Sequence, residues 1–95
     1  MTNYEVMFII DPTLEDAVKE STVEAVKGII AAQGEVGEVD VWGMRKLAYP
    51  IMKKTEGYYV VVEFKGEKTL PKELDRRLKI SDNVIRHIIV NKDEK

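Results

Sequence analysis

The chain has 95 residues, which is enough for one domain with a single small core. Hydrophobic residues make up 44% and charged residues 34% of it, a globular mixture that excludes disorder as the default state. The formal net charge of -2 excludes a strongly cationic nucleic-acid-binding protein, so any RNA contact must come from a local patch. We expect one domain over residues 1–95, of which residues 91–95 form a short charged tail.

Residue counts exclude several kinds of site. The sequence has no cysteine, so a disulfide scaffold, a cysteine-ligated zinc site and a thiol nucleophile are impossible. His87 is the only histidine, which excludes a metal cage built from several histidines. No apolar run approaches the roughly 20 residues that span a bilayer, and the first residues lack the pattern of a signal peptide. We expect a soluble cytoplasmic protein with no metal, no cofactor and no membrane partner.

A strand followed by a helix is predicted in the first third of the chain. Residues 4–10 are rich in β-branched and aromatic side chains, which is typical of a strand. From Leu14 the apolar residues fall mostly at three- and four-residue steps with charged residues between them, which predicts an amphipathic helix. Asp11 or Thr13 can cap this helix, and Gly34 is a natural stop at its C-terminal end.

Two strands are predicted in the middle of the chain. The first covers residues 36–52, with a bend expected at Gly37 or Gly43. Residues 52–57 read as a polar hairpin connection, and residues 58–64 form the clearest strand in the sequence.

A second helix and a last strand complete the prediction. Thr69 can cap the helix, and Leu70, Leu74 and Leu78 mark one face of it at four-residue spacing. After a turn, residues 84–90 are again typical of a strand.

The predicted order is therefore β-α-β-β-α-β. With right-handed crossovers, two such units interleave into a four-stranded antiparallel sheet with both helices on one face. This α+β arrangement is the ferredoxin-like fold, and it leaves the other face of the sheet open.

The open face offers a candidate interaction surface. Strand periodicity places alternate side chains on opposite faces of the sheet. The core-facing set is expected to contain Val6, Phe8, Ile10, Val60, Val62 and Phe64. The open face is then expected to show Met7, Ile9, Tyr59 and Val61 together. Such an apolar patch marks a protein interface in some proteins and is an ordinary half-apolar sheet surface in others.

Catalytic constellations are missing from the sequence. A serine nucleophile needs a base beside it, and only His87 is available, on a strand face shared with Ile85 and Ile89. That position is more typical of a core or edge histidine than of a catalytic one. No G-x-G-x-x-G or P-loop motif occurs. We expect no enzymatic activity and no small-molecule substrate.

Charge is distributed unevenly along the chain. Residues 1–40 hold nine acids and two bases, for -7, so residues 41–95 carry +5. The bases gather at Arg45-Lys46, at Lys53-Lys54, and around Arg76, Arg77, Lys79 and Arg86. Lysines and arginines bind phosphate by displacing counterions, whereas most charge runs only keep a surface solvated. Residues 41–55 are hardly interrupted by acids, which favours phosphate binding, while the helix bases beside Glu73 and Asp75 fit solvation better.

Two other functions of the same fold compete with phosphate binding by a local basic patch. One is an RNA recognition motif, which needs base-stacking aromatic residues at alternate positions of its central strands. The first strand has Met7 and Ile9 at these positions, so it offers a poor stacking surface. A ferredoxin-like regulatory or ligand-sensing domain that forms homodimers through its open face remains the main alternative.

Residues 43–51 read Gly-Met-Arg-Lys-Leu-Ala-Tyr-Pro-Ile, a run that resembles the signature of the bacterial small-subunit ribosomal protein six family. The likeness extends from end to end. Residues 1–10 resemble the opening strand of the family, Gly57-Tyr58-Tyr59 the entry to its third strand, and residues 78–86 its final helix-to-strand turn. Met52 departs from the family, which more often has a small or polar residue there.

The resemblance implies a structural protein that binds the central domain of small-subunit ribosomal RNA as a heterodimer with small-subunit ribosomal protein eighteen. By their place in the motif, Arg45 and Lys46 are implied RNA contacts, and Arg86 at the matching final-strand position is another. The charge argument alone adds Lys53 and Lys54. The expected patch of Met7, Ile9, Tyr59 and Val61 would suit the protein partner.

Overall fold

Six elements follow one another in the predicted order β-α-β-β-α-β. The computed structural model describes residues 2–51 and 54–93, and it gives the backbone alone for residues 48–51 and 54. The strands are β1 (Thr2–Ile10), β2 (Gly34–Ile51), β3 (Lys54–Gly66) and β4 (Val84–Asn91), and the helices are α1 (Asp16–Gln33) and α2 (Thr69–Lys79).

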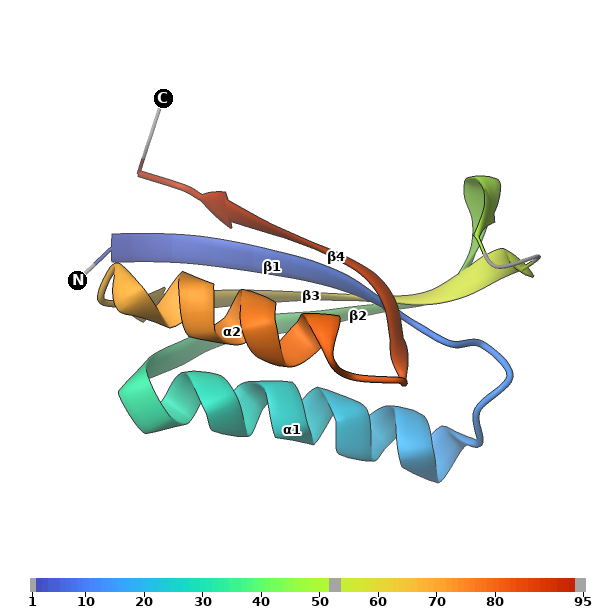
Figure 1. The fold of residues 1–95 in the computed structure, drawn as a ribbon, viewed down its shortest axis with the longest axis horizontal. Coiled ribbons are helices and arrows are strands. Elements are labelled where there is room, and N and C mark those ends of the chain that lie inside the picture. The colour runs from blue at the N-terminus through green and yellow to red at the C-terminus, as the bar shows by residue number, and fades with distance from the viewer. Residues whose placement is uncertain (1, 52–53, 94–95) are drawn as a thin grey trace.

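The four strands form one antiparallel sheet in the order β2-β3-β1-β4. Both helices lie side by side against the same face of this sheet, and the β2–β3 hairpin extends beyond it (Figure 1). The predicted ferredoxin-like arrangement is confirmed. It leaves β2 and β4 as the two edge strands and the face opposite the helices open.

The core lies between the sheet and the two helices, where the sequence predicts it. The expected inward set of Val6, Phe8, Ile10, Val60, Val62 and Phe64 is at most 2% exposed. From the helices, the residues packed against this set are Val26, Ile30, Leu70, Leu74 and Leu78. Tyr4 adds a stacked contact with Phe64 at 5.4 Å between ring centroids, so the aromatic rings of two paired strands close one end of the core.

The two helices begin without the expected side-chain caps. Glu15 is the N-cap of α1 and makes no capping hydrogen bond, while Asp11 instead accepts hydrogen bonds from the backbone amide and hydroxyl of Thr13. Lys68 is the N-cap of α2, and Thr69 is already helical. The cap predictions were wrong because Asp11 stabilises a local turn, and because tertiary packing sets where each helix starts. No helix in the described ranges has the length and apolarity to cross a bilayer.

The β2–β3 hairpin differs from the prediction near its tip. A polar connection is expected over residues 52–57, but β3 already begins at Lys54, and Lys46 pairs with Glu56 and Arg45 with Gly57. The prediction was wrong for residues 54–57 because ladder hydrogen bonds do not require apolar side chains. Met52 and Lys53 lie outside the described residues.

The bends predicted in β2 are confirmed. The register against β3 shifts between Val36 and Val39 and again between Val41 and Gly43. Gly43 has φ 78°, a left-handed conformation that glycine adopts without the steric penalty of a side chain. The extra residue at this second bulge is Trp42, whose position matters for the open face.

A bulge in β4 changes which of its residues meet the core. Ile10 pairs with Val84 while Ile9 pairs with Arg86, so Ile85 is the extra residue. Val84 and Ile89 pack against the core, and Ile85 is not among the residues that do.

His87 keeps its inward place, confirming the predicted face. The side chain is 12% exposed, and its Nε2 lies 2.6 Å from Oδ1 of Asp75 on α2. Lys79 lies 3.0 Å from the other carboxylate oxygen of Asp75. The carboxylate therefore links α2 to the edge strand β4.

Truncation of a core leucine of α2 should lower stability. Leu74 is fully buried, so Leu74→Ala removes apolar contacts and leaves a cavity, which should reduce the free energy of unfolding by about 2–5 kcal/mol. Urea unfolding followed by circular dichroism measures this change. Ile80→Ala, at a side chain that is 68% exposed just after the same helix, should change it by less than about 0.5 kcal/mol.

The link between α2 and β4 should make stability depend on pH. The hydrogen bond with His87, followed by that with Lys79, lowers the pKa of Asp75 below its ordinary value of 3.8. A lowered folded-state pKa stabilises the protein above the ordinary value, and this contribution disappears as the pH falls through the folded-state pKa. Asp75→Asn should therefore lower the free energy of unfolding at pH 7, and the difference from the unsubstituted chain should shrink as the pH falls below 3.8.

Urea unfolding at a series of pH values tests this expectation. Asp82→Asn is the control, because Asp82 is an exposed carboxylate in the turn before β4. A difference for Asp75→Asn that stays constant from pH 7 to pH 2 would contradict the proposed role of the carboxylate.

Candidate functional site

The open face of the sheet brings together the four apolar residues that the sequence singles out. Met7 pairs with Val61 and Ile9 with Tyr59, so the four form a block across the central strands β1 and β3. Only Met7 and Tyr59 are partly exposed, however, because Ile9 is 4% and Val61 is 8% exposed. The expectation of an exposed patch was wrong for Ile9 and Val61.

Ile9 is buried on the open face because residues of the hairpin lie around it. A Cβ placed on Gly57 would lie 2.3 Å from Cγ2 of Ile9, so the isoleucine occupies the space that a larger residue in β3 would need. The same position would lie 3.4 Å from Leu47 and 3.6 Å from Tyr59. Ile9 thus belongs to a small second cluster on the open face and supports the base of the hairpin.

Trp42 lies on the open face, where the sequence pattern did not predict it, as is also true of two residues of β4. Its ring stacks on Tyr59 with 6.2 Å between centroids and 6° between planes, and its Nε1 donates a 2.9 Å hydrogen bond to Asp40. The indole remains 43% exposed although it is held in place on both sides. The signal available in the sequence was the single tryptophan next to Gly43 in a predicted bend.

The exposed apolar part of the open face therefore differs from the predicted one. Ile88 pairs with Met7 and Val90 with Glu5, so both β4 residues lie on this face, where they are 42% and 48% exposed. We define the apolar face by its exposed and partly exposed members: Met7, Trp42, Tyr59, Ile88 and Val90. It spans all four strands and matches the kind of contiguous surface that partner proteins cover.

Acidic side chains border the apolar face. Glu5, Glu38, Asp40 and Glu63 line a hollow of about 190 Å³ together with Trp42 and Val61. Lys92 is the cation in contact with this group among the described residues, through Glu63 and, at 3.8 Å, Glu5. The hydrogen bond with Glu63 raises the pKa of Lys92. We call this border the acidic rim. Because it has four acids and one cation, it repels phosphate and attracts cations.

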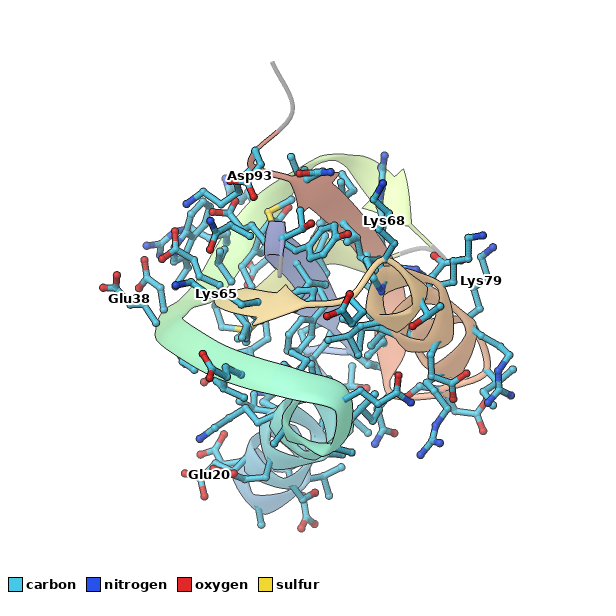
Figure 2. All side chains as sticks on the ribbon, turned by 90° about the vertical axis from the view of Figure 1, so that its left-hand side faces the viewer. Glu20, Glu38, Lys65, Lys68, Lys79 and Asp93 are labelled. Carbon is cyan, nitrogen blue, oxygen red and sulfur yellow. The ribbon has the colours of Figure 1, made fainter. Side chains whose placement is uncertain are left out.

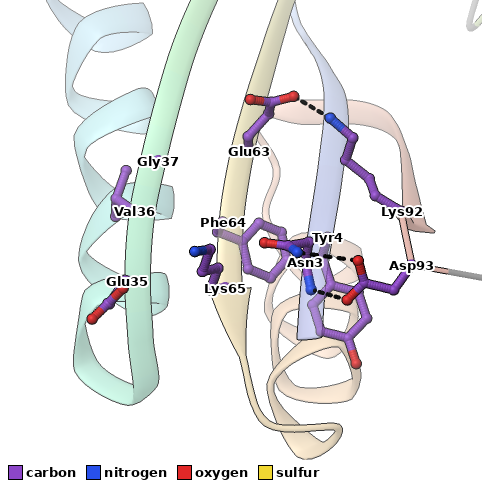
Figure 3. A pocket seen from close by; sticks show the side chains of 10 residues that line it. All are labelled: Asn3, Tyr4, Glu35, Val36, Gly37, Glu63, Phe64, Lys65, Lys92 and Asp93. Atoms are coloured by element: carbon purple, nitrogen blue, oxygen red, sulfur yellow. Dashed lines mark hydrogen bonds and ion pairs between the residues drawn. The ribbon is translucent and has the colours of Figure 1, made fainter. Parts of the chain in front are cut away.

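A larger hollow beside the acidic rim has no single sign of charge. It measures about 490 Å³ and is lined by the start of β1, the start of β2, the end of β3 and the chain after β4 (Figure 3). Asp93 accepts hydrogen bonds from the backbone and side chain of Asn3 at 2.9 and 3.1 Å, and Lys92 contacts Glu63 there. These contacts hold residues 92 and 93 against β1, and they use the charges of Glu63, Lys92 and Asp93 within the chain.

The motif cations lie on the hairpin. Arg45 and Lys46 are both exposed and stand next to each other in β2, so the pleat directs them to opposite sides of the strand. Arg86 is exposed on β4, beside Ile9, on the open side of the sheet. The predicted RNA contacts therefore do not converge on one flat face. Lys53 lies outside the described residues, and for Lys54 only the backbone is described.

The sequence is similar to those of known ribosomal proteins. The sequence model of the family described as "Ribosomal protein S6" matches residues 3–91. A protein of Clostridioides difficile named "Small ribosomal subunit protein bS6" is 51% identical over 90 residues, covering 95% of this chain and 98% of that protein. A Clostridium kluyveri protein of the same name is 53% identical over 96 residues, covering 100% of both.

A solved structure agrees with the sequence relatives. The crystal structure of 30S ribosomal protein S6 from Thermotoga maritima matches with a TM-score of 0.93 and 35% identity, over 98% of this chain and 89% of that one. The family that the Gly43–Ile51 run resembles is thereby confirmed. The chain belongs to the ribosomal protein S6 family.

Proposed function

We propose that this chain is a structural constituent of the bacterial small ribosomal subunit, where it binds the central domain of small-subunit ribosomal RNA together with small-subunit ribosomal protein eighteen. The observation that carries the proposal is the family match over residues 3–91, joined to near-complete coverage of relatives named for that subunit. The chain works by binding in the cytoplasmic ribosome and performs no chemical step.

The two ligands are assigned to different parts of the molecule by charge. Arg45 and Lys46 give the hairpin a positive end, which suits phosphate, and Arg86 lies on the same side of the sheet as Arg45. The acidic rim disfavours RNA on the open face but favours a cationic protein, whose apolar residues would cover Trp42 and Tyr59. Protein eighteen is therefore assigned to the part of the open face around Trp42 and the acidic rim, and RNA to the hairpin and the adjoining Arg86.

A homodimer is the competing use of the open face, in a regulatory or ligand-sensing domain. In a two-fold symmetric contact, the same patch meets itself. Each copy would then bring an acidic rim to the contact and offer no cationic surface to balance it, which costs free energy because the like charges of the two rims repel. Size-exclusion chromatography separates the two uses, since a tight homodimer of the isolated chain would support the competing one.

Removal of the motif cations should weaken RNA binding. In the presence of protein eighteen, Arg45→Ala/Lys46→Ala should lower the affinity for a central-domain transcript and reduce the dependence of log K on log salt by about 1 for each phosphate that is no longer neutralised. Filter binding or fluorescence anisotropy over a salt series measures both quantities. Lys27→Ala/Arg77→Ala removes the same charge from the helical layer and should leave the salt dependence unchanged. Equal salt dependence for both double variants would contradict the hairpin assignment.

Truncation on the open face should weaken protein binding. Tyr59 is the aromatic residue that supports Trp42, so Tyr59→Ala should raise the dissociation constant for purified protein eighteen by about tenfold or more. Isothermal titration calorimetry measures the affinity, and circular dichroism checks that the variant is folded. Ile80→Ala, an exposed apolar truncation outside the sheet, is the control. An unchanged dissociation constant for folded Tyr59→Ala would exclude the open face as the binding surface.

A further inference from the structure

One face of α2 carries three lysines, and only Lys79 among them has an ion-pair partner among the described residues. Lys68, Lys72 and Lys79 are spaced by four and seven residues, so they share a side of the helix, away from Leu70 and Leu74 in the core. All three lysines are exposed. Figure 2 shows Lys68 and Lys79 pointing outward from α2, on the side away from Glu20 and Glu38. We call these three lysines the basic face of α2.

The acids of α2 do not neutralise the first half of this face. Glu73 is bonded to Arg76 through two hydrogen bonds of 3.1 and 2.7 Å. Asp75 is occupied by His87 and Lys79. Among the described residues, Lys68 and Lys72 have no ion-pair partner. Residues 68–79 hold five bases and two acids, for a net charge of +3, whereas α1 holds two bases and three acids, for -1.

Helix stability does not account for Lys68 and Lys72. The N-terminal end of a helix has a partial positive charge, so cations there are unfavourable and acids are favourable. Lys68 is the N-cap of α2, and the first turn contains no acid. The cations at the C-terminal end, Arg76 and Lys79, agree with the helix dipole, but Lys68 and Lys72 oppose it.

The basic face is placed where it can act together with the hairpin. It lies in the helical layer, so a protein on the open face would leave it accessible. The C-terminal end of α2 and the start of β4 lie toward the end of the molecule from which the hairpin extends (Figure 1). From Lys68 to Lys79 the helix rises by about 16 Å, which is long enough to follow several phosphates of one RNA strand.

We propose that the basic face of α2 binds the phosphate backbone of a second segment of ribosomal RNA, independently of base sequence. The inference rests on the proposed function and adds to it an RNA contact remote from the hairpin. Lysines contribute here as point charges that release condensed counterions, so the contact adds affinity and salt dependence without reading bases.

The test uses the full chain, protein eighteen and a central-domain transcript. Lys68→Gln/Lys72→Gln removes the two lysines that have no ion-pair partner among the described residues, and the dipole argument predicts that the variant is at least as stable as the unsubstituted chain. It should lower RNA affinity several-fold and reduce the magnitude of the salt slope by about 1 to 2. Hydroxyl-radical footprinting should show reduced protection at nucleotides that remain protected in Arg45→Ala/Lys46→Ala.

The matched control is Lys27→Gln/Arg77→Gln. It changes the net charge equally, but Lys27 is on α1 and Arg77 lies at the groove between the two helices. If the basic-face variant and this control bind with the same affinity, salt slope and footprint while the unsubstituted chain binds RNA, the further inference is wrong and the proposed function stands. If the unsubstituted chain with protein eighteen fails to bind the transcript, both are wrong.

Discussion

The pairing of β1 with β3 determines both faces of the sheet. Its nine residue pairs run from Thr2 opposite Gly66 to Ile10 opposite Tyr58 without a shift, whereas both edge strands pair with shifts. Because side chains alternate along a strand, this register sends Phe8 into the core and Met7 to the open face. A slip of one residue would exchange the two faces, so the surface assigned to a protein partner depends on the same hydrogen bonds as the core.

Charge is separated in space in a way that the net value of -2 conceals. The acidic rim lies on the open face, and α1 is also slightly acidic, while cations lie on the hairpin and along one side of α2. Such a molecule is attracted to RNA in some orientations and repelled in others. A cationic partner on the open face would cover the acids that oppose RNA, which gives a physical reason for binding in partnership.

The order of elements and the core could be predicted from sequence because both depend on local periodicity. The alternation of residues 58–64 and the four-residue spacing of leucines in α2 each report burial within one element. The motif at Gly43–Ile51 likewise indicated the family and its cations. The burial of Ile9, the stacking of Trp42 and the bulge at Ile85 could not be predicted. Each depends on a bulge, or on a glycine in the neighbouring strand, and therefore on the register between distant segments.

The central position of β1 has a consequence for synthesis on the ribosome. Its two neighbours in the sheet, β3 and β4, are both made later, and β3 begins only at Lys54. During synthesis β1 therefore exists as an apolar strand with two unpaired edges until more than half of the chain has been made, a state open to wrong pairing. The local β2–β3 hairpin forms in one step of chain growth and presents the edge that β1 requires. Completion of this hairpin therefore covers one edge of β1, and the other edge stays unpaired until β4 has been made.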